Sequence, residues 1–177
     1  MYICRLFLPR ELFTTYLITE IYNTMNPNIT IRLMTAEDYA RVYHLWSVTD
    51  GMALRGYDDS EEGICKFLKK NPTSNFVALR GDDLVGVILC GMDGRRAYIY
   101  HTVVRSDLRN QGIGKALLHA VYAAAEQEGI KKSGLLVMKH NEIGNAFWRS
   151  QGWTERTDLN YYSFKNQEQE ERNQPMP

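Results

Sequence analysis

The chain has 177 residues, of which 44% are hydrophobic, and its 21 basic and 21 acidic side chains give a formal net charge of zero. This length and composition are typical of a soluble globular domain with a sizeable core, and the charge balance argues against a nucleic-acid-binding protein, which usually carries a basic surplus. The three cysteines form no C-x-x-C pair, so neither a disulfide framework nor a metal site is predicted.

Both ends of the chain are expected to lie outside the folded domain. Residues 1–24 are fairly hydrophobic, but charges interrupt them before they reach the ~20 apolar residues of a membrane span, and no signal-peptide cleavage site follows. We interpret them as an N-terminal extension, either helical or upstream of a start at Met25. Residues 167–177 are polar and expected to be disordered. One domain is therefore predicted over residues 25–166, in a reducing cytoplasm.

The first half of this domain reads as a strand followed by two helices. Alternating apolar residues predict a strand over 28–33. Thr35, with Asp38 three residues on, is typical of a helix cap, and apolar residues at helical spacing continue to Trp46. A second helix is predicted over 60–70, where Asn-Pro follows.

A hairpin series and a long helix come next. Strands are predicted over 76–80, 84–90 and 97–104, separated by turns rich in glycine and aspartate. Residues 112–128 form an amphipathic helical pattern, and Gly129 is the expected C-cap.

The C-terminal part is predicted to complete the sheet. A buried strand over 133–139 is followed by a short helix that Asn141 caps, and two further strands are expected over 153–159 and 161–165. The fold class is therefore α/β in an α+β layered arrangement: a mixed, mostly antiparallel sheet of about six to seven strands with about four flanking helices.

The loop from Arg109 to Gly114 carries the strongest chemical signal. It joins a strand to a helix, and a helix N-terminus presents unpaired N–H groups with partial positive charge. A phosphate accepts such donors directly, and glycine at positions 112 and 114 allows a tight backbone path with close approach. Arg109 and Lys115 add positive charge. The segment therefore predicts an anion site, the alternative being an ordinary tight turn.

Two familiar phosphate motifs do not fit this loop. A nucleoside-triphosphate loop needs a hydroxyl residue after its lysine and a glycine at its start, but Ala116 and Arg109 occupy these positions. A dinucleotide fingerprint needs a third glycine where Leu117 stands.

The six residues instead match the pattern R/Q-x-x-G-x-G/A, and Asn141-x-x-Gly144 followed by Phe147 to Trp153 matches a second, N-x-x-A…Y-x-x-x-G-F-like run. With this order of elements, the chain from Ile29 to Lys165 resembles the GNAT superfamily of N-acetyltransferases. The resemblance implies acetyl-CoA as co-substrate. The residues implied to bind it are Thr102, Val103, Val104, Arg109, Asn110, Gln111, Gly112, Ile113, Gly114, Lys115, Asn141 and Trp148.

The catalytic groups common in that family are missing. Many relatives have a glutamate at the position of Tyr100, others have one at Leu136, and a tyrosine acid stands where this chain has Trp148. The remaining candidates are His101, whose chemistry suits a base near neutral pH, and Tyr100, which with Tyr98 and Asp93 would line an ordered water. Strand alternation places Tyr98 and Tyr100 on one face and His101 on the other.

Two functions follow from the resemblance. The first is acetyl transfer to a primary amine of a small molecule or peptide; the second is a catalytically weak acyl-CoA-binding sensor. The acceptor region of the family corresponds to residues 46–70, where acidic side chains either attract a cationic amine or simply favour a helix start. These acidic residues are Asp50, Asp58, Asp59, Glu61 and Glu62. Neither nucleic acid nor membrane is expected as a partner, and a homodimer is considered.

Overall fold

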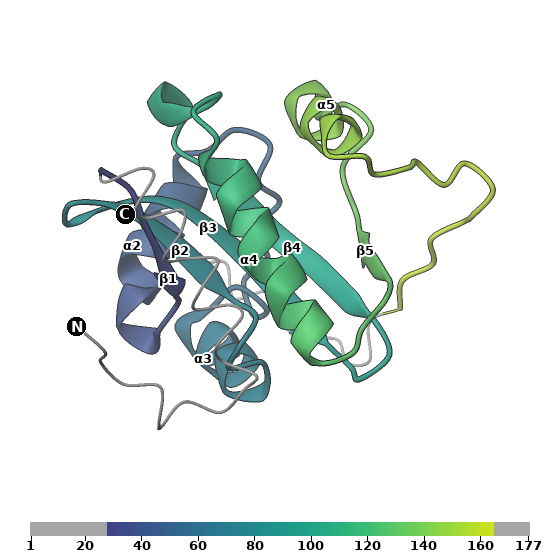
Figure 1. The fold of residues 1–177 in the computed structure, drawn as a ribbon, viewed down its shortest axis with the longest axis horizontal. Coiled ribbons are helices and arrows are strands. Elements are labelled where there is room, and N and C mark those ends of the chain that lie inside the picture. Colours follow the sequence, from purple (N-terminus) through teal and green to yellow (C-terminus); the bar gives the residue numbers. More distant parts are fainter. Residues whose placement is uncertain (1–27, 165–177) are drawn as a thin grey trace, which may run out of the picture. The chain divides into compact units, whose positions relative to one another are not determined.

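In the computed structural model, residues 28–164 are described, and they divide into two compact units, 28–138 and 139–164. The first unit contains a single five-stranded sheet (Figure 1). The second contains one helix, α5 (Glu142–Ser150), and a following stretch without helix or strand. The predicted extension at 1–24 and the tail at 167–177 lie outside the described residues. No helix in the described part is long and apolar enough to cross a membrane.

The sheet has the strand order β1-β2-β3-β4-β5. The first four strands pair antiparallel and β5 joins β4 in parallel. Their bounds are β1 Thr30–Leu33, β2 Phe76–Arg80, β3 Asp83–Met92, β4 Ala97–Val104 and β5 Ser133–Leu135. The predicted strands in the first unit are thus confirmed, although β3 extends through the expected turn at Gly91 and β5 is shorter than predicted.

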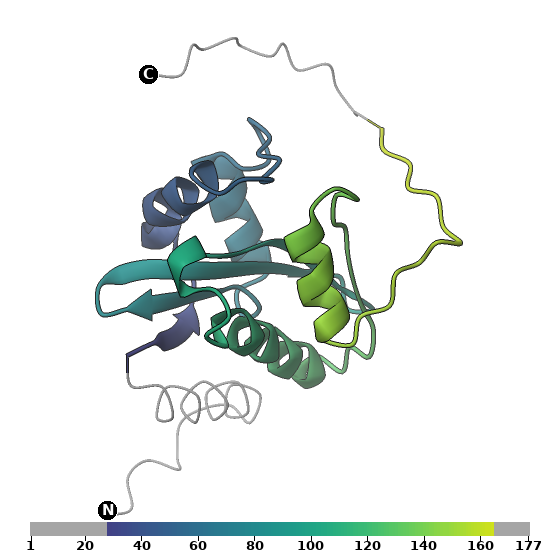
Figure 2. The same ribbon diagram turned by 90° about the horizontal axis from the view of Figure 1, so that it is seen from above.

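Helices cover both faces of the sheet. The helices α2 (Tyr39–Ser47) and α3 (Glu61–Lys70) lie on one face, and α4 (Ile113–Gln127) lies on the other (Figure 2). Two short 3-10 turns, Ala36–Asp38 and Ser106–Leu108, precede α2 and α4. Together with α5 these are four helices in the described part of the chain, the number predicted.

The core beneath α2 and α3 is continuous with the site described below. Val42, Leu45 and Trp46 of α2 pack with Ile64 of α3 and with residues of the central strands, including Val103. On the opposite face, Leu117 of α4 lies so close to β3 that a Cβ added to Gly86 would stand 3.2 Å from its Cδ1. Burial of these large side chains on both faces holds the central strand β3 and its neighbour β4 in place.

Asp38 links β1 to α2 through hydrogen bonds. Its buried carboxylate accepts hydrogen bonds from both terminal nitrogens of Arg32, at 2.6 and 2.8 Å, and from Arg41 at 2.6 Å. It also accepts the backbone N–H of Thr35 at 3.0 Å, which confirms the predicted capping pair. Burial alone would raise the pKa of Asp38, but these donors outweigh burial and hold the pKa well below its usual range.

The predicted strands after α5 are wrong for the described residues. Residues 153–164 contain no strand, and Lys165 lies outside them. The sheet therefore has five strands rather than six to seven. Alternating apolar residues show only that a segment suits a pleated surface, whereas a strand also needs an edge to pair with. Tyr161, Tyr162 and Phe164 are exposed in this stretch.

Candidate functional site

The strand β4 loses one of its two neighbours halfway along its length. It pairs with β5 only from Ala97 to Ile99, whereas its pairing with β3 continues to Val104. Figure 1 shows the short strand β5 beside the beginning of β4 only. Within the described chain, no strand pairs with Thr102 to Val104 on the β5 side. This half of β4 therefore offers a backbone edge to a ligand.

The alternation of the antiparallel ladder decides which backbone groups face that edge. The N–H of Arg105 donates to the carbonyl of Val85 on β3 at 2.8 Å. Because backbone groups of successive residues point to opposite sides, Val103 directs its groups to β3, while Thr102 and Val104 direct theirs to the open edge. Accordingly, the Val104 carbonyl accepts a hydrogen bond from Nε of Arg109 at 3.2 Å. Of the three predicted cofactor residues on β4, Thr102 and Val104 direct backbone groups to the open edge, and Val103 packs in the core.

The loop after β4 leads into α4 through two left-handed residues. Asn110 has a φ of 62° and Gly112 a φ of 81°. Asparagine tolerates this region better than other side chains, and glycine enters it freely. A Cβ built on Gly112 would meet no atom within 4 Å. Glycine at position 112 is therefore required by the left-handed backbone angle and not by a lack of space for a side chain.

The start of α4 presents unpaired donors. The first helical bond runs from the N–H of Ala116 to the carbonyl of Gly112, at 2.9 Å. The N–H groups of Ile113, Gly114 and Lys115 precede it and have no acceptor within the helix. Lys115 is exposed, and the Arg109 side chain lies between this loop and the β4 edge. The donors and positive charges fit a pyrophosphate with a pantetheine arm along β4.

A β-bulge places Tyr100 and His101 opposite a single residue of β3. Ile88 pairs with Thr102 and Cys90 with Ile99, so only Leu89 stands opposite the two residues. Tyr100 contacts Phe67 of α3, and His101 contacts Trp46 of α2, with ring centroids 5.6 and 4.8 Å apart. Since α2 and α3 cover the same face, the predicted placement of Tyr100 and His101 on opposite faces is wrong. The extra residue of the bulge breaks the alternation.

His101 is held by a buried carboxylate. Its Nε2 lies 2.6 Å from Oδ1 of Asp59, whose side chain is 7% exposed, while the His101 side chain is 23% exposed. The other oxygen, Oδ2, accepts the backbone N–H of Arg55 at 2.7 Å. Burial raises the pKa of Asp59, but the hydrogen bonds from His101 and Arg55 prevail and hold it below its usual value. An ionised Asp59 therefore orients the imidazole and favours a proton on Nε2.

The other acidic candidates have simpler roles. Glu61 and Glu62 lie exposed in the first turn of α3, where the helix dipole favours acids. Asp93 accepts the N–H groups of Arg95 and Arg96 at 2.7 Å each and thereby shapes the β3–β4 turn. No group of three or more potential metal-ligating side chains occurs among the residues that the structure describes.

In the second unit, the two predicted cofactor residues have local partners. Asn141 caps α5 by accepting the N–H of Gly144 at 2.8 Å. Trp148 is buried against Phe147 and Trp153, with centroid separations of 5.0 and 5.1 Å. Trp148 thus belongs to an aromatic cluster within its own unit.

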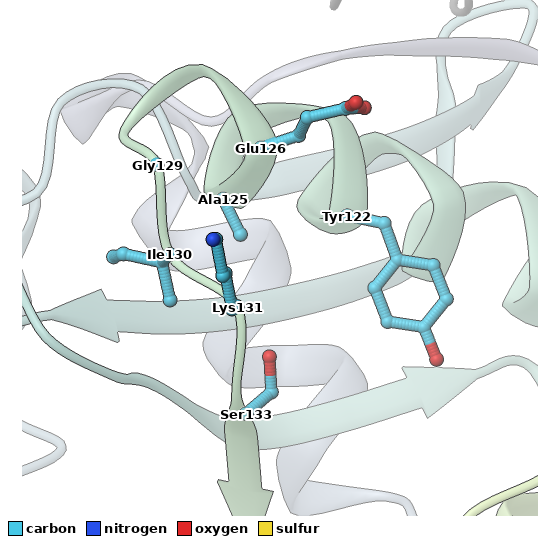
Figure 3. Close-up of a pocket in the computed structure, with 7 residues that line it drawn as sticks. All are labelled: Tyr122, Ala125, Glu126, Gly129, Ile130, Lys131 and Ser133. Atoms are coloured by element: carbon cyan, nitrogen blue, oxygen red, sulfur yellow. The ribbon is translucent and has the colours of Figure 1, made fainter.

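A hollow at the other end of α4 lies away from these groups. It is lined by residues of the helix and of the segment that follows it, namely Tyr122, Ala125, Glu126, Gly129, Ile130, Lys131 and Ser133 (Figure 3). The helix has 15 residues, so this hollow is roughly 20 Å from Gly112 at a rise of about 1.5 Å per residue. It holds none of the predicted site residues.

Sequence reasoning missed the partnership of Asp59 and His101. Asp59 was one of five acidic residues in its region, and nothing local distinguishes it from Asp58. The pair is separated by 42 positions, and the bulge that brings His101 to this face leaves no signal in the strand pattern.

Comparison with known proteins agrees with the geometry. The model of the acetyltransferase (GNAT) family matches residues 35–153. An acetyltransferase of Pectobacterium atrosepticum is 31% identical over 112 residues, which make up 63% of this chain and 78% of the relative.

Solved structures share the fold. An aminoglycoside acetyltransferase from an uncultured soil metagenomic sample, in complex with sisomicin, superimposes with a TM-score of 0.65 at 23% identity, over 80% of this chain and 99% of the other. The PaiA N-acetyltransferase of Thermoplasma acidophilum, in complex with coenzyme A, gives a TM-score of 0.62 at 19% identity, over 70% and 87%. With the family match over most of its length, the chain belongs to the acetyltransferase (GNAT) family and is an acetyl-CoA-dependent acyltransferase.

Proposed function

We propose that the protein transfers the acetyl group of acetyl-CoA to a primary amine by direct attack of the amine on the thioester carbonyl. A C–N bond forms and the C–S bond breaks. The thiolate of coenzyme A leaves, and the proton of the attacking amine passes to a base on the protein. The observation that carries the proposal is the open edge of β4 at Thr102 and Val104, which runs directly into the loop at the N-terminus of α4.

The donor-binding residues are assigned from this continuity. The N–H groups of Ile113, Gly114 and Lys115, with the charge of Arg109, would hold the pyrophosphate. The loop residues Asn110, Gln111 and Gly112 supply the backbone path around it. The edge groups of Thr102 and Val104 would pair with the amides of pantetheine. For Asn141 and Trp148, the support is the family motif alone.

His101 is our candidate for the base. Asp59 holds a proton on Nε2, so the lone pair of Nδ1 is left to accept a proton from the amine. The ring is partly exposed and follows Tyr100 in the bulge, one residue before the open edge begins at position 102. Tyr100 would line the acceptor side of the same centre.

Direct attack needs no acetylated enzyme, and of the two cysteines that the structure describes, Cys90 is a poor nucleophile. Burial raises the pKa of Cys90 to about 12, so its thiol stays protonated. Cys65 lies on α3, partly buried. Incubation with acetyl-CoA without an amine should therefore leave the intact mass of the protein unchanged. A stable acetyl adduct on a cysteine that is transferred to an added amine would contradict direct attack.

The central experiment is the release of free thiol from acetyl-CoA by the full chain, measured across a panel of primary amines with product detection by mass spectrometry. We expect amine-dependent release with at least one amine and an acetylated product. Tight binding of acetyl-CoA without amine-dependent thiol release on any member of the panel would overturn the proposal and favour a sensor.

A further inference from the structure

Three aromatic rings form a surface on the face of the sheet that α3 covers. Phe67 meets Tyr100 edge-on, with ring centroids 5.6 Å apart, and Tyr100 meets Tyr98 at 5.3 Å with tilted planes. Tyr100 is 48% exposed. We call Phe67, Tyr98 and Tyr100 the aromatic platform. None of these residues belongs to the donor site.

Glycines in the two neighbouring strands make room for this platform. A Cβ on Gly91 of β3 would stand 3.2 Å from Cε2 of Phe67 and 3.3 Å from Cε2 of Tyr100. A Cβ on Gly134 of β5 would stand 3.2 Å from Cε2 of Tyr98. These distances are tighter than ordinary contacts, so the rings rest directly on backbone on both sides of β4. The missing side chains thus leave the space that the rings occupy.

The segments next to the platform carry basic residues. Lys70 follows Phe67 by three residues and so shares its side of α3. Arg96 precedes Tyr98 by two residues, and the carbonyl of Lys132 accepts the N–H of Ala97 at 3.2 Å. Asp93 is held in the β3–β4 turn and Asp59 holds His101, while Glu61 and Glu62 lie in the first turn of α3, at the opposite end of the helix from Lys70. A polycationic acceptor would meet repulsion here, whereas an aromatic group would find ring edges and faces to pack against.

We propose that the platform binds the body of the acceptor, and that the acceptor is an amine carried on an aromatic ring rather than a polyamine. The inference rests on the proposed function, because it places the amine beside His101. Tyr100 and His101 are adjacent in the bulge, so a ring on the platform brings an amine on a short linker to the base. Favourable ring packing is typically worth a several-fold to tenfold gain in binding.

The test compares kcat/KM for 2-phenylethylamine, hexylamine and spermidine with the full chain. We expect 2-phenylethylamine to exceed hexylamine by roughly tenfold, and spermidine to be the poorest acceptor. The variants Tyr98→Leu and Phe67→Leu, which keep bulk but remove the ring, should each reduce the preference for the aromatic amine to about threefold or less. Tyr122→Leu on α4, on the other face, should leave the preference unchanged.

The possible failures are distinguishable. Spermidine as the best acceptor would overturn the platform while leaving acetyl transfer to amines intact, and so would an aromatic preference that survives both leucine variants. Thiol release with none of the amines tested here or in the wider panel would instead overturn the proposed function. Should one leucine variant fail to fold, Gly134→Ala gives a second probe, because its added Cβ displaces the Tyr98 ring and should lower the same preference.

Discussion

Replacing Asp59 with asparagine isolates the role of the carboxylate that holds His101. In the native protein, Oδ2 accepts the backbone N–H of Arg55 and Oδ1 lies 2.6 Å from Nε2 of His101. An asparagine has one oxygen and one NH2 group. Since the backbone N–H can only donate, the amide oxygen must face Arg55, and the NH2 group must face the imidazole. Nε2 then has to accept, which moves the ring proton to Nδ1 and removes the proposed base.

The expected loss follows from what a base contributes. Positioned general bases are worth about 10² to 10⁴ in rate, and the imidazole can still flip to its less favoured tautomer, so we expect kcat to fall about a hundredfold. The KM for acetyl-CoA should not change, because Asp59 is not one of the donor-binding residues. Loss of a charge-assisted bond at this buried site should also lower the free energy of unfolding by about 1–3 kcal/mol.

The assay is steady-state thiol release at saturating amine, with thermal unfolding measured in parallel. Asp58→Asn, the exposed neighbour, is the matched control and should behave as the native protein does. In a His101→Ala background, Asp59→Asn should lower kcat no further, because the two act as one unit. A folded Asp59→Asn enzyme with kcat within about threefold of the native value would refute the reasoning and remove His101 from the mechanism.

Three further predictions concern the fold and its limits. Because the folded pKa of Asp38 is lowered, its stabilising effect is complete above pH ~4, the ordinary value for aspartate, and is lost as the pH falls below it. Asp38→Asn should cost about 3 kcal/mol, at the low end for a broken buried pair because Arg32 and Arg41 are partly exposed. Denaturant unfolding of the native protein and of Asp38→Asn at pH 7 and pH 3 measures both the cost of the substitution and its pH dependence. If the variant loses as much stability between pH 7 and pH 3 as the native protein does, Asp38 is not the source of the acid sensitivity. Trp148→Phe should keep most activity if the indole only packs in its cluster, and a large loss of turnover in this variant, well folded, would show that the indole does more. Trp148→Tyr should raise turnover if a phenol can protonate the leaving thiolate. A protein trimmed to residues 25–166 should fold and turn over the same amine as the full chain. Sedimentation and steady-state kinetics of the two proteins check this, and a trimmed protein that is monodisperse but does not bind acetyl-CoA would show that the domain boundary is wrong.

The parts of the fold that could be predicted are those that local sequence controls. The bounds of β2 and β4 agree with the predicted strands residue for residue, because each is a run of apolar and β-branched residues between turns. The glycines predicted a tight turn into the helix, which we propose binds the anion, and the left-handed φ of Gly112 gives the physical reason for glycine there.

The parts that could not be predicted depend on contacts across the chain. The bulge at Tyr100 and His101 reflects a register shift against β3, and an alternating pattern cannot reveal an extra residue. The partnership of His101 with Asp59 spans two elements and likewise has no local signature. The predicted strands after Trp153 had suitable residues, but whether a partner edge exists is a property of the whole sheet.

The most direct test of the account is calorimetric titration of acetyl-CoA into the native chain, Gly112→Val and Gly129→Val. Both glycines have a left-handed φ, 81° and 67°, and open space where a Cβ would go, but they lie at opposite ends of α4. Both variants should therefore carry a similar conformational penalty of at least about 1–2 kcal/mol. We predict that Gly112→Val weakens acetyl-CoA binding on the order of a hundredfold, as expected for the loss of about two charge-assisted hydrogen bonds, while Gly129→Val binds as the native protein does. Equal affinity in all three folded proteins would contradict the assignment of the loop as the coenzyme A site.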